Sequence, residues 1–301
     1  MAFSASDAAF EGFRVVRRHP FALVFWALLY VVVFGVAFAL VGGNMVTLIA
    51  AMSRLETTGG TPTLEDLQPV IQTYLTMLVV LVPLFLVASA VLTSAISRAV
   101  LRPGTSAFGY MRLGADEIRV LVVTIAVGFV MVALMALFGV LIGVAYGATS
   151  GTSAGGLIVA VLCVAALGAY IWLMVRLSLA VPITIAERRI AVFDSFRVTK
   201  GHFWSLLGMA LLAGVMSFVV SILGSIVTMP IQMMTGGGFK ALEGMDGGNM
   251  MAMLQTAWPS ILVMVVLQAI LSALQLAVIY APFSAAYRDI KGGQPNADVF
   301  E

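Results

Sequence analysis

The stretch VLVVTIAVGFVMVALMALFGVLIGVA, which runs from Val120 to Ala145, contains no charged residue. At a rise of about 1.5 Å per residue, a helix of this length crosses the roughly 30 Å hydrocarbon core of a bilayer. The stretch is continuously apolar, whereas the strands of a membrane β-barrel alternate apolar and polar residues. Because backbone polar groups in lipid must be bonded within the segment itself, this stretch predicts a transmembrane α-helix.

Five further runs of about twenty residues or more are equally free of charge. They are Phe21–Val41, Tyr74–Ser97, Gly156–Val175, Phe203–Met234 and Trp258–Tyr287. Hydrophobic residues make up 61% of the chain and charged residues 10%, where soluble domains carry about 25% charged residues. The sequence therefore predicts an all-α integral membrane protein with six transmembrane helices.

The residues at and between the ends of these runs predict where the spans continue, where they bend and where the outer loops lie. We expect the fourth run to continue past Arg176 through Leu177–Ala186. The first run exceeds the apolar core of about 7–15 residues in a secretory signal peptide, so we expect it to remain as a span. Proline lacks the N–H that a helix needs, so bends or breaks are expected at Pro83, Pro182, Pro230 and Pro282. The outer loops are expected at Gly42–Thr73, Tyr146–Gly155 and Thr235–Ala257.

The basic residues predict the orientation, because cytoplasmic loops carry an excess of Lys and Arg. One side of the six spans has only Arg54 and Lys240. The other side has fourteen of the 16 basic residues, which are Arg14, Arg17, Arg18, Arg98, Arg102, Arg112, Arg119, Arg176, Arg188, Arg189, Arg197, Lys200, Arg288 and Lys291. We therefore expect both termini in the cytoplasm.

A short motif recurs before the first, third and fifth runs. It reads Phe-Glu-Gly-Phe-Arg-Val from Phe10, Phe-Gly-Tyr-Met-Arg-Leu from Phe108 and Phe-Asp-Ser-Phe-Arg-Val from Phe193. We predict one membrane domain, residues 1–301, built from three repeat units at about residues 1–104, 105–189 and 190–301. Each unit is expected to be a helical hairpin preceded by a short cytoplasmic amphipathic helix at the membrane interface. The alternative is that the motif is a generic juxtamembrane linker.

The sequence offers little chemistry for an enzyme. It has two histidines and one cysteine, Cys163, and nearly all its acidic residues lie at or beyond the ends of the runs. No Ser/His/Asp order, phosphate-binding glycine loop or HExxH motif occurs. His19, Glu117 and His202 occupy equivalent repeat positions, but such residues are more often polar groups at the membrane edge. We predict no catalytic residue, no metal site and no cofactor. The net charge of +2 is small, which argues against a nucleic-acid partner.

Arg176 is the most informative single residue, because the equivalent repeat positions are Leu86 and Leu276. If the fourth helix runs to Glu187, Arg176 lies about 15 Å inside that end. A charge at that depth usually marks a site or a buried pair. The alternative is that the span ends at Arg176 and that its side chain reaches the cytoplasmic headgroups.

Two sets of residues on single helix faces have competing explanations. Gln268, Ser272 and Gln275 either line a substrate path near Arg176 or form hydrogen bonds between helices. The glycines of the third run have the four-residue spacing that suits close helix contact, and they are Gly139, Gly143 and Gly147.

The segment from Arg176 to Trp204 resembles a bacterial family. Arg176, Pro182 and Glu187 are followed by Ser195, Thr199-Lys200-Gly201 and Trp204, and the sixth run ends in Tyr287-Arg-Asp-Ile-Lys291. This pattern is similar to the membrane domain associated with glycerophosphoryl diester phosphodiesterases and to related small inner-membrane proteins. The resemblance covers mainly the second half, and the catalytic domain of those enzymes has no counterpart here. It implies the bacterial cytoplasmic membrane, a lipid-related role, an ion-pair or headgroup site at Arg176 and Glu187, and a phosphate-facing Lys200.

Together these observations predict a non-enzymatic scaffold or accessory factor in envelope and lipid processes. Its expected partners are membrane lipids and a membrane protein. The alternative prediction is a small-molecule or lipid transporter, whose path would be lined by Arg176, Gln268 and Gln275.

Overall fold

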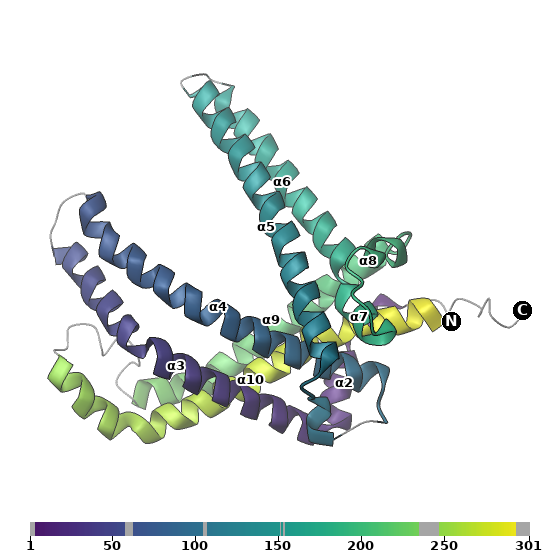
Figure 1. Ribbon diagram of the computed structural model, residues 1–301, viewed down its shortest axis with the longest axis horizontal. Coiled ribbons are helices and arrows are strands. Elements are labelled where there is room, and N and C mark those ends of the chain that lie inside the picture. The colour runs from purple at the N-terminus through teal and green to yellow at the C-terminus, as the bar shows by residue number, and fades with distance from the viewer. Residues whose placement is uncertain are drawn as a thin grey trace, which may run out of the picture. The chain divides into compact units, whose positions relative to one another are not determined.

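A computed structural model describes residues 4–57, 63–104, 107–150, 152, 154–234 and 247–292 of the chain. Within these residues all regular structure is helical (Figure 1). The helices are α1 (Ala5–Ala9), α2 (Glu11–Arg18), α3 (Pro20–Thr57), α4 (Leu64–Leu101), the 3-10 helix η1 (Ala107–Tyr110), α5 (Ala115–Thr149), α6 (Gly155–Leu177), α7 (Ala180–Glu187), α8 (Asp194–Val198), α9 (Phe203–Met234) and α10 (Gly247–Gly292).

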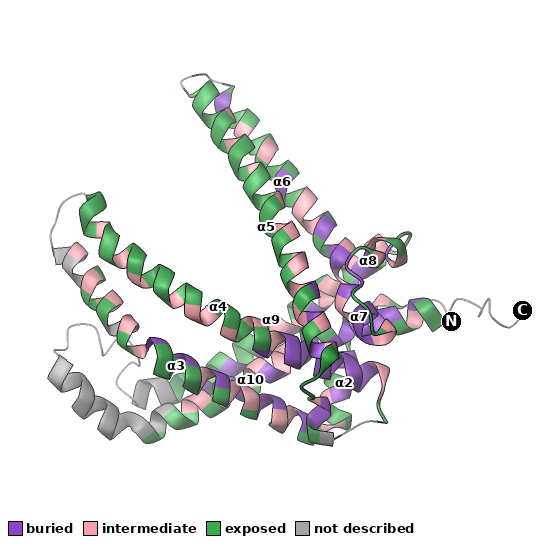
Figure 2. Ribbon diagram, in the orientation of Figure 1, coloured by how far each residue is buried: buried purple, intermediate pink, exposed green. Residues whose placement is uncertain are grey.

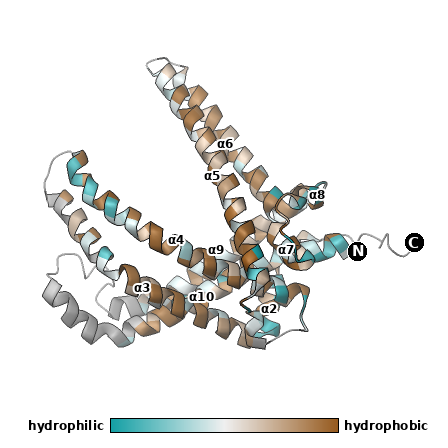
Figure 3. Ribbon diagram, in the orientation of Figure 1, coloured by the Kyte–Doolittle hydropathy of each residue, from teal (hydrophilic) through white to brown (hydrophobic). Residues whose placement is uncertain are grey.

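Six segments of the described chain are long and apolar enough to span a membrane, which confirms the number expected from the sequence. The colouring in Figure 3 shows this hydrophobic character along α5 and α6, for example. The segments are Pro20–Met52, Leu64–Leu101, Phe108–Thr149, Gly155–Glu187, Phe203–Pro230 and Leu262–Gly292.

The helices extend further than the charge-free runs, so two of the expected outer loops are partly helical. The region Gly42–Thr73 is helical up to Thr57 and again from Leu64. The region Thr235–Ala257 is helical from Gly247 onward, and its other residues, Lys240 among them, lie outside the described residues. The physical reason is that charge marks where hydrocarbon ends, whereas a helix continues as long as its residues favour helical bonding.

Only one of the four expected proline sites interrupts a helix. α6 ends at Leu177 and α7 begins at Ala180, with Pro182 in the first turn of α7. The helices α4, α9 and α10 continue through Pro83, Pro230 and Pro282.

The chain forms two compact units, and each is described by itself. Unit 1 comprises Met1–Val15, Ala90–Gly214 and Val278–Glu301, and unit 2 comprises Val16–Ser89 and Val215–Ala277. The single membrane domain expected from the sequence stays a prediction.

Unit 2 packs through aromatic and small residues. Trp26 of α3 is almost fully buried at 1% exposure. Phe34 of α3 contacts Phe85 of α4, with 6.4 Å between the ring centroids. A Cβ at Gly224 of α9 would lie 2.6 Å from a side-chain carbon of Leu271 on α10. Glycine therefore allows α9 and α10 to approach closely in this unit.

Unit 1 contains the α5–α6 hairpin, whose two helices run side by side (Figure 1). A hydrophobic cluster joins the lower part of this hairpin to α7 and the α7–α8 loop, and its buried members are Val123, Leu173, Leu177, Ala180 and Val192. Figure 2 shows that exposed residues predominate along the rest of α5 and α6. In each of these two spans only 11% of the most apolar stretch is buried.

Short helices stand at the three motif positions, before α3, α5 and α9. The first and third are the α-helices α2 and α8, whereas the second is the 3-10 helix η1. Phe108, Gly109 and Tyr110 in η1 have φ values of 50°, 65° and 64°. This left-handed backbone cannot continue an α-helix, which limits the second short helix to a 3-10 turn. That the three short helices are amphipathic and lie at the membrane interface stays a prediction.

Candidate functional site

The break between α6 and α7 lies at the centre of the candidate site in unit 1. Pro182 has no N–H to donate, and its ring crowds the preceding turn, which favours an interruption just before it. The hydroxyl of Ser195, on α8, bonds one backbone group on each side of the break. It accepts a hydrogen bond from the N–H of Leu179 at 3.2 Å and donates one to the carbonyl oxygen of Arg176 at 2.6 Å.

The side chain of Arg176 connects the end of α6 to the end of α8. Its Nη1 donates to the carbonyl oxygen of Phe196 at 3.2 Å and to Oγ1 of Thr199 at 3.4 Å. The guanidinium carbon lies 5.7 Å from the centre of the Trp172 ring, a cation–π distance. A cation at a helix C-terminus compensates the open carbonyl groups there. Arg176 therefore holds α8 in position.

Aromatic residues and two cations are exposed around α8. We define the α8 surface as Trp172, Phe193, Arg197, Lys200 and Trp204. Its aromatic residues are Trp172, Phe193 and Trp204, which are 47%, 70% and 79% exposed. Both basic side chains are exposed as well. Large exposed rings beside cations are typical of surfaces that meet a membrane interface.

Glu187, the last residue of α7, is the centre of a polar cluster. Its Oε1 accepts hydrogen bonds from Nζ of Lys291 at 2.7 Å and from the hydroxyl of Tyr287 at 3.3 Å. Its Oε2 accepts from Nη2 of Arg189 at 2.7 Å, and the same arginine pairs with Asp194 of α8 at 2.7 Å. The hydrogen bond from Glu187 and the charge of Asp194 raise the pKa of Arg189 above its ordinary value. The cluster links α7, α8 and the end of α10.

Two arginines at the end of α4 make further polar contacts in unit 1. Arg98 forms an ion pair with Glu117 and donates from Nη1 to the carbonyl oxygen of Tyr110 at 2.7 Å. The other carboxylate oxygen of Glu117 accepts the N–H of Gly114 at 3.0 Å, so this acid also caps α5. Arg102 donates to two carbonyl oxygens at the end of α7, at 3.2 and 3.3 Å.

The residues singled out from the sequence divide between the two units. Arg176, Glu187 and Lys200 belong to unit 1, whereas Gln268 and Gln275 belong to unit 2. Arg176 bonds α8, while Glu187 bonds Lys291, Tyr287 and Arg189, so these two predicted residues have different partners. Gln268 is exposed and Gln275 is half-buried. A path shared by Arg176 and the two glutamines stays a prediction.

Two features of the packing were missed in the sequence. The first is the buried pair of Arg98 and Glu117. In the sequence these are one basic and one acidic residue at the ends of successive spans, and nothing there indicates that they form a pair. The second is a line of buried alanines along α10, spaced by four residues, which is a spacing visible in the sequence. Its members are Ala269, Ala273, Ala277, Ala281 and Ala285, each at most 1% exposed. Such lines allow helices to pack closely in membranes.

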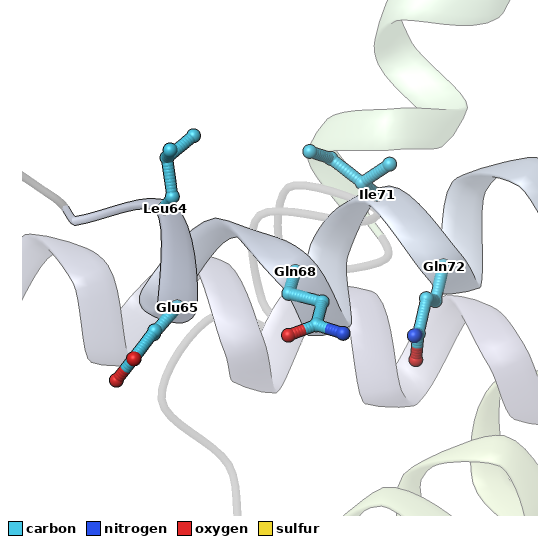
Figure 4. A pocket seen from close by; sticks show the side chains of 5 residues that line it. All are labelled: Leu64, Glu65, Gln68, Ile71 and Gln72. Carbon is cyan, nitrogen blue, oxygen red and sulfur yellow. The ribbon is translucent and has the colours of Figure 1, made fainter.

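A shallow hollow lies in unit 2, along the first turns of α4. Figure 4 shows the side chains that line it, which are Leu64, Glu65, Gln68, Ile71 and Gln72. Glu65 is the one ionisable group among these five, and none of the residues expected from the sequence is among them. The hollow therefore adds no residue to the candidate site.

Known proteins give no further assignment of this site. No family model, curated protein or solved structure matches the chain. The resemblance in the segment from Arg176 to Trp204 therefore stays an expectation. In the described part of the chain, no three His, Cys, Asp or Glu side chains are grouped as a metal site would require.

Proposed function

We propose that this protein is a non-enzymatic, multi-pass protein of the bacterial cytoplasmic membrane that acts as a scaffold or accessory factor in envelope lipid processes. One observation carries the proposal: the side chains of Arg176 and Glu187 are bonded to their own chain. Ionisable groups used in this way position helices, whereas a transporter or an enzyme must present such groups to a substrate.

The proposed topology has three hairpins, with α3 and α4, α5 and α6–α7, and α9 and α10 as the pairs and with both termini in the cytoplasm. The excess of fourteen basic residues over two on that side supports the orientation. The repeat is supported by Phe10, Phe108 and Phe193, which hold the same position in the three motifs and are 48%, 73% and 70% exposed. Exposed aromatic rings at these places suit helices that lie in the interface.

The α5–α6 hairpin is the proposed contact surface for a membrane protein partner. Only 11% of the most apolar stretch is buried in each of its spans. Apart from the neighbouring backbone of α5 itself, no atom lies within 4 Å of the place that a Cβ would take at Gly139, Gly143 or Gly147. The helix contact that this glycine spacing favours is therefore left open to a second protein.

Site-specific photocrosslinking in living cells tests the scaffold role. A photoreactive residue at Val140 or Val144, which flank Gly143 and are 64% and 66% exposed, should give one crosslinked product of constant mass. The matched control is Val79 on α4, which is 74% exposed, and it should give no such product. Crosslinking to lipid alone at all three positions would contradict the scaffold proposal.

A transporter remains the second candidate, because α6 and α7 form a broken span and broken spans often build transport sites. It requires Arg176, Gln268 and Gln275 to act on one ligand. Their substitution by alanine should then abolish ligand-dependent thermal stabilisation of the protein in detergent, in a screen of small anionic and lipid-derived compounds. The scaffold proposal expects no stabilising compound that depends on all three residues.

A further inference from the structure

The two basic residues of the α8 surface are exposed and stand outside the ion pairs described in unit 1. The carboxylate of Asp194 is the acidic group on α8 itself, and it is paired with Arg189. Among the residues that the structure describes, no ion-pair partner or side-chain hydrogen bond is assigned to Arg197 or Lys200. Elsewhere in unit 1, Arg119 and Lys291 are paired with carboxylates at 2.6 and 2.7 Å, whereas Arg112 and Arg188 are exposed and, among the described residues, have no assigned ion-pair partner either. The α8 surface therefore carries two positive charges that nearby acids do not neutralise.

Its place in the chain puts this surface next to the headgroup region of a bilayer. α8 lies between two candidate spans, Gly155–Glu187 and Phe203–Pro230. The rings of Trp172 and Phe196 meet edge to face, with 5.9 Å between their centres, so the aromatic group extends from α6 onto α8. Tryptophan rings favour the boundary between hydrocarbon and headgroups, where phosphate groups are the abundant anions.

The cations are attached to a segment that the rest of unit 1 holds in place. Ser195 and Thr199, on either side of Arg197, are fully buried. Ser195 bonds the backbone at the α6–α7 break, and Thr199 accepts a hydrogen bond from Arg176. The backbone that carries Arg197 and Lys200 is therefore ordered before any ligand arrives, which lowers the entropic cost of binding.

We propose that the α8 surface binds the phosphate of an anionic membrane phospholipid. Arg197 and Lys200 donate to the phosphate oxygens, and the rings of Trp172, Phe193 and Trp204 lie against the glycerol and upper acyl region. Arginine and lysine are the usual phosphate ligands, the first through a forked set of donors and the second as a point charge. The inference rests on the proposed membrane location but not on the scaffold role.

The test uses the full chain reconstituted in phosphatidylcholine nanodiscs that contain a minority of phosphatidylglycerol. Native mass spectrometry after release from the disc measures how strongly retained phosphatidylglycerol is enriched over phosphatidylcholine. Near a membrane surface each basic residue contributes about a fivefold attraction for anionic lipid. The double variant Arg197→Gln/Lys200→Gln should therefore lose about 25-fold in enrichment.

The matched control is Arg14→Gln/Arg119→Gln, which removes the same charge from two side chains that are already paired with carboxylates and are 40% and 33% exposed. It should retain the enrichment of the unaltered protein. Equal losses in the two double variants would assign the effect to total charge and overturn the proposal. Displacement of phosphatidylglycerol by an equal concentration of inorganic phosphate would overturn the assignment to a lipid.

Failure of this inference is distinguishable from failure of the proposed function. A chain that does not insert into nanodiscs at all contradicts the membrane location itself. A chain that inserts but retains the two lipids in their bulk ratio contradicts only the lipid site. Thermal unfolding of both double variants in the same discs tests whether a lost preference for phosphatidylglycerol is instead caused by a loss of folding.

Discussion

Arg98 and Glu117 form an ion pair in unit 1 with side chains that are only 5% and 7% exposed. Nη1 of the arginine also donates to the carbonyl oxygen of Tyr110, and the second carboxylate oxygen accepts the N–H of Gly114. The guanidinium of Arg98 and the carboxylate of Glu117 therefore each have a backbone hydrogen bond in addition to the ion pair. Removal of either partner leaves the other buried without its counter-charge, which costs far more than the net stability that an intact pair contributes.

We predict that Arg98→Ala lowers the free energy of unfolding by about 3–5 kcal/mol, and that Glu117→Ala has an effect of similar size. The double variant should lose less than the sum of the two. Arg119→Ala removes a more exposed pair with Asp116 and should cost less than about 1 kcal/mol. Thermal unfolding in detergent, followed by intrinsic fluorescence, measures all four. Additive losses in the double variant would contradict the coupling.

The hydroxyl of Ser195 is expected to stabilise the α6–α7 break. Ser195→Ala leaves the buried N–H of Leu179 without its acceptor, and we predict a loss of about 1–3 kcal/mol. Ser178→Ala is the matched control, because that hydroxyl donates to Val175 within the same turn at 2.8 Å. Hydrogen exchange at the Leu179 amide should accelerate in the first variant only. Unchanged exchange in Ser195→Ala would show that the bond is dispensable.

Two neighbouring glycines should respond in opposite ways at the start of α6. A Cβ at Gly155 would lie 2.6 Å from the carbonyl oxygen of Thr149, whereas one at Gly156 would meet no atom within 4 Å. We predict that Gly155→Ala destabilises the hairpin by about 1–3 kcal/mol. Gly156→Ala should be neutral or stabilising by up to about 1 kcal/mol, because alanine favours a helix. Equal melting temperatures for the two variants would contradict the close turn.

The contact between Asp7 and Arg14 predicts a pH dependence near the N-terminus. The hydrogen bond and the charge of Arg14 hold the pKa of Asp7 below its ordinary value of 3.8. Because the folded pKa is lower than the unfolded one, the contact stabilises at neutral pH and is lost as the pH falls through the folded value. A carboxyl titration by NMR should show a lowered midpoint that rises in Arg14→Gln. The same midpoint in both proteins would exclude the contact.

The six spans could be predicted from the sequence because lipid imposes one simple rule, a continuous apolar run long enough to cross. The helix ends could not, since residues such as those up to Thr57 continue a helix without being apolar. The partners of Arg176 were also out of reach. The sequence places Arg176 near the end of the fourth run, and the structure adds its bonds to Phe196 and Thr199. Those contacts join residues 20 and 23 positions apart, and only the folded loop brings them together.

The hydroxyl that bonds the α6–α7 break has a consequence for biosynthesis. Ser195 lies sixteen positions after Leu179, so the ribosome has made the whole fourth span before it adds the residue that bonds the open backbone groups. Until then the N–H of Leu179 needs another acceptor and the carbonyl oxygen of Arg176 another donor, such as water, since an unbonded backbone group in lipid costs several kcal/mol. We expect the nascent fourth span to remain at the exit of the insertion machinery, and to enter the bilayer fully only once α8 has folded back onto it.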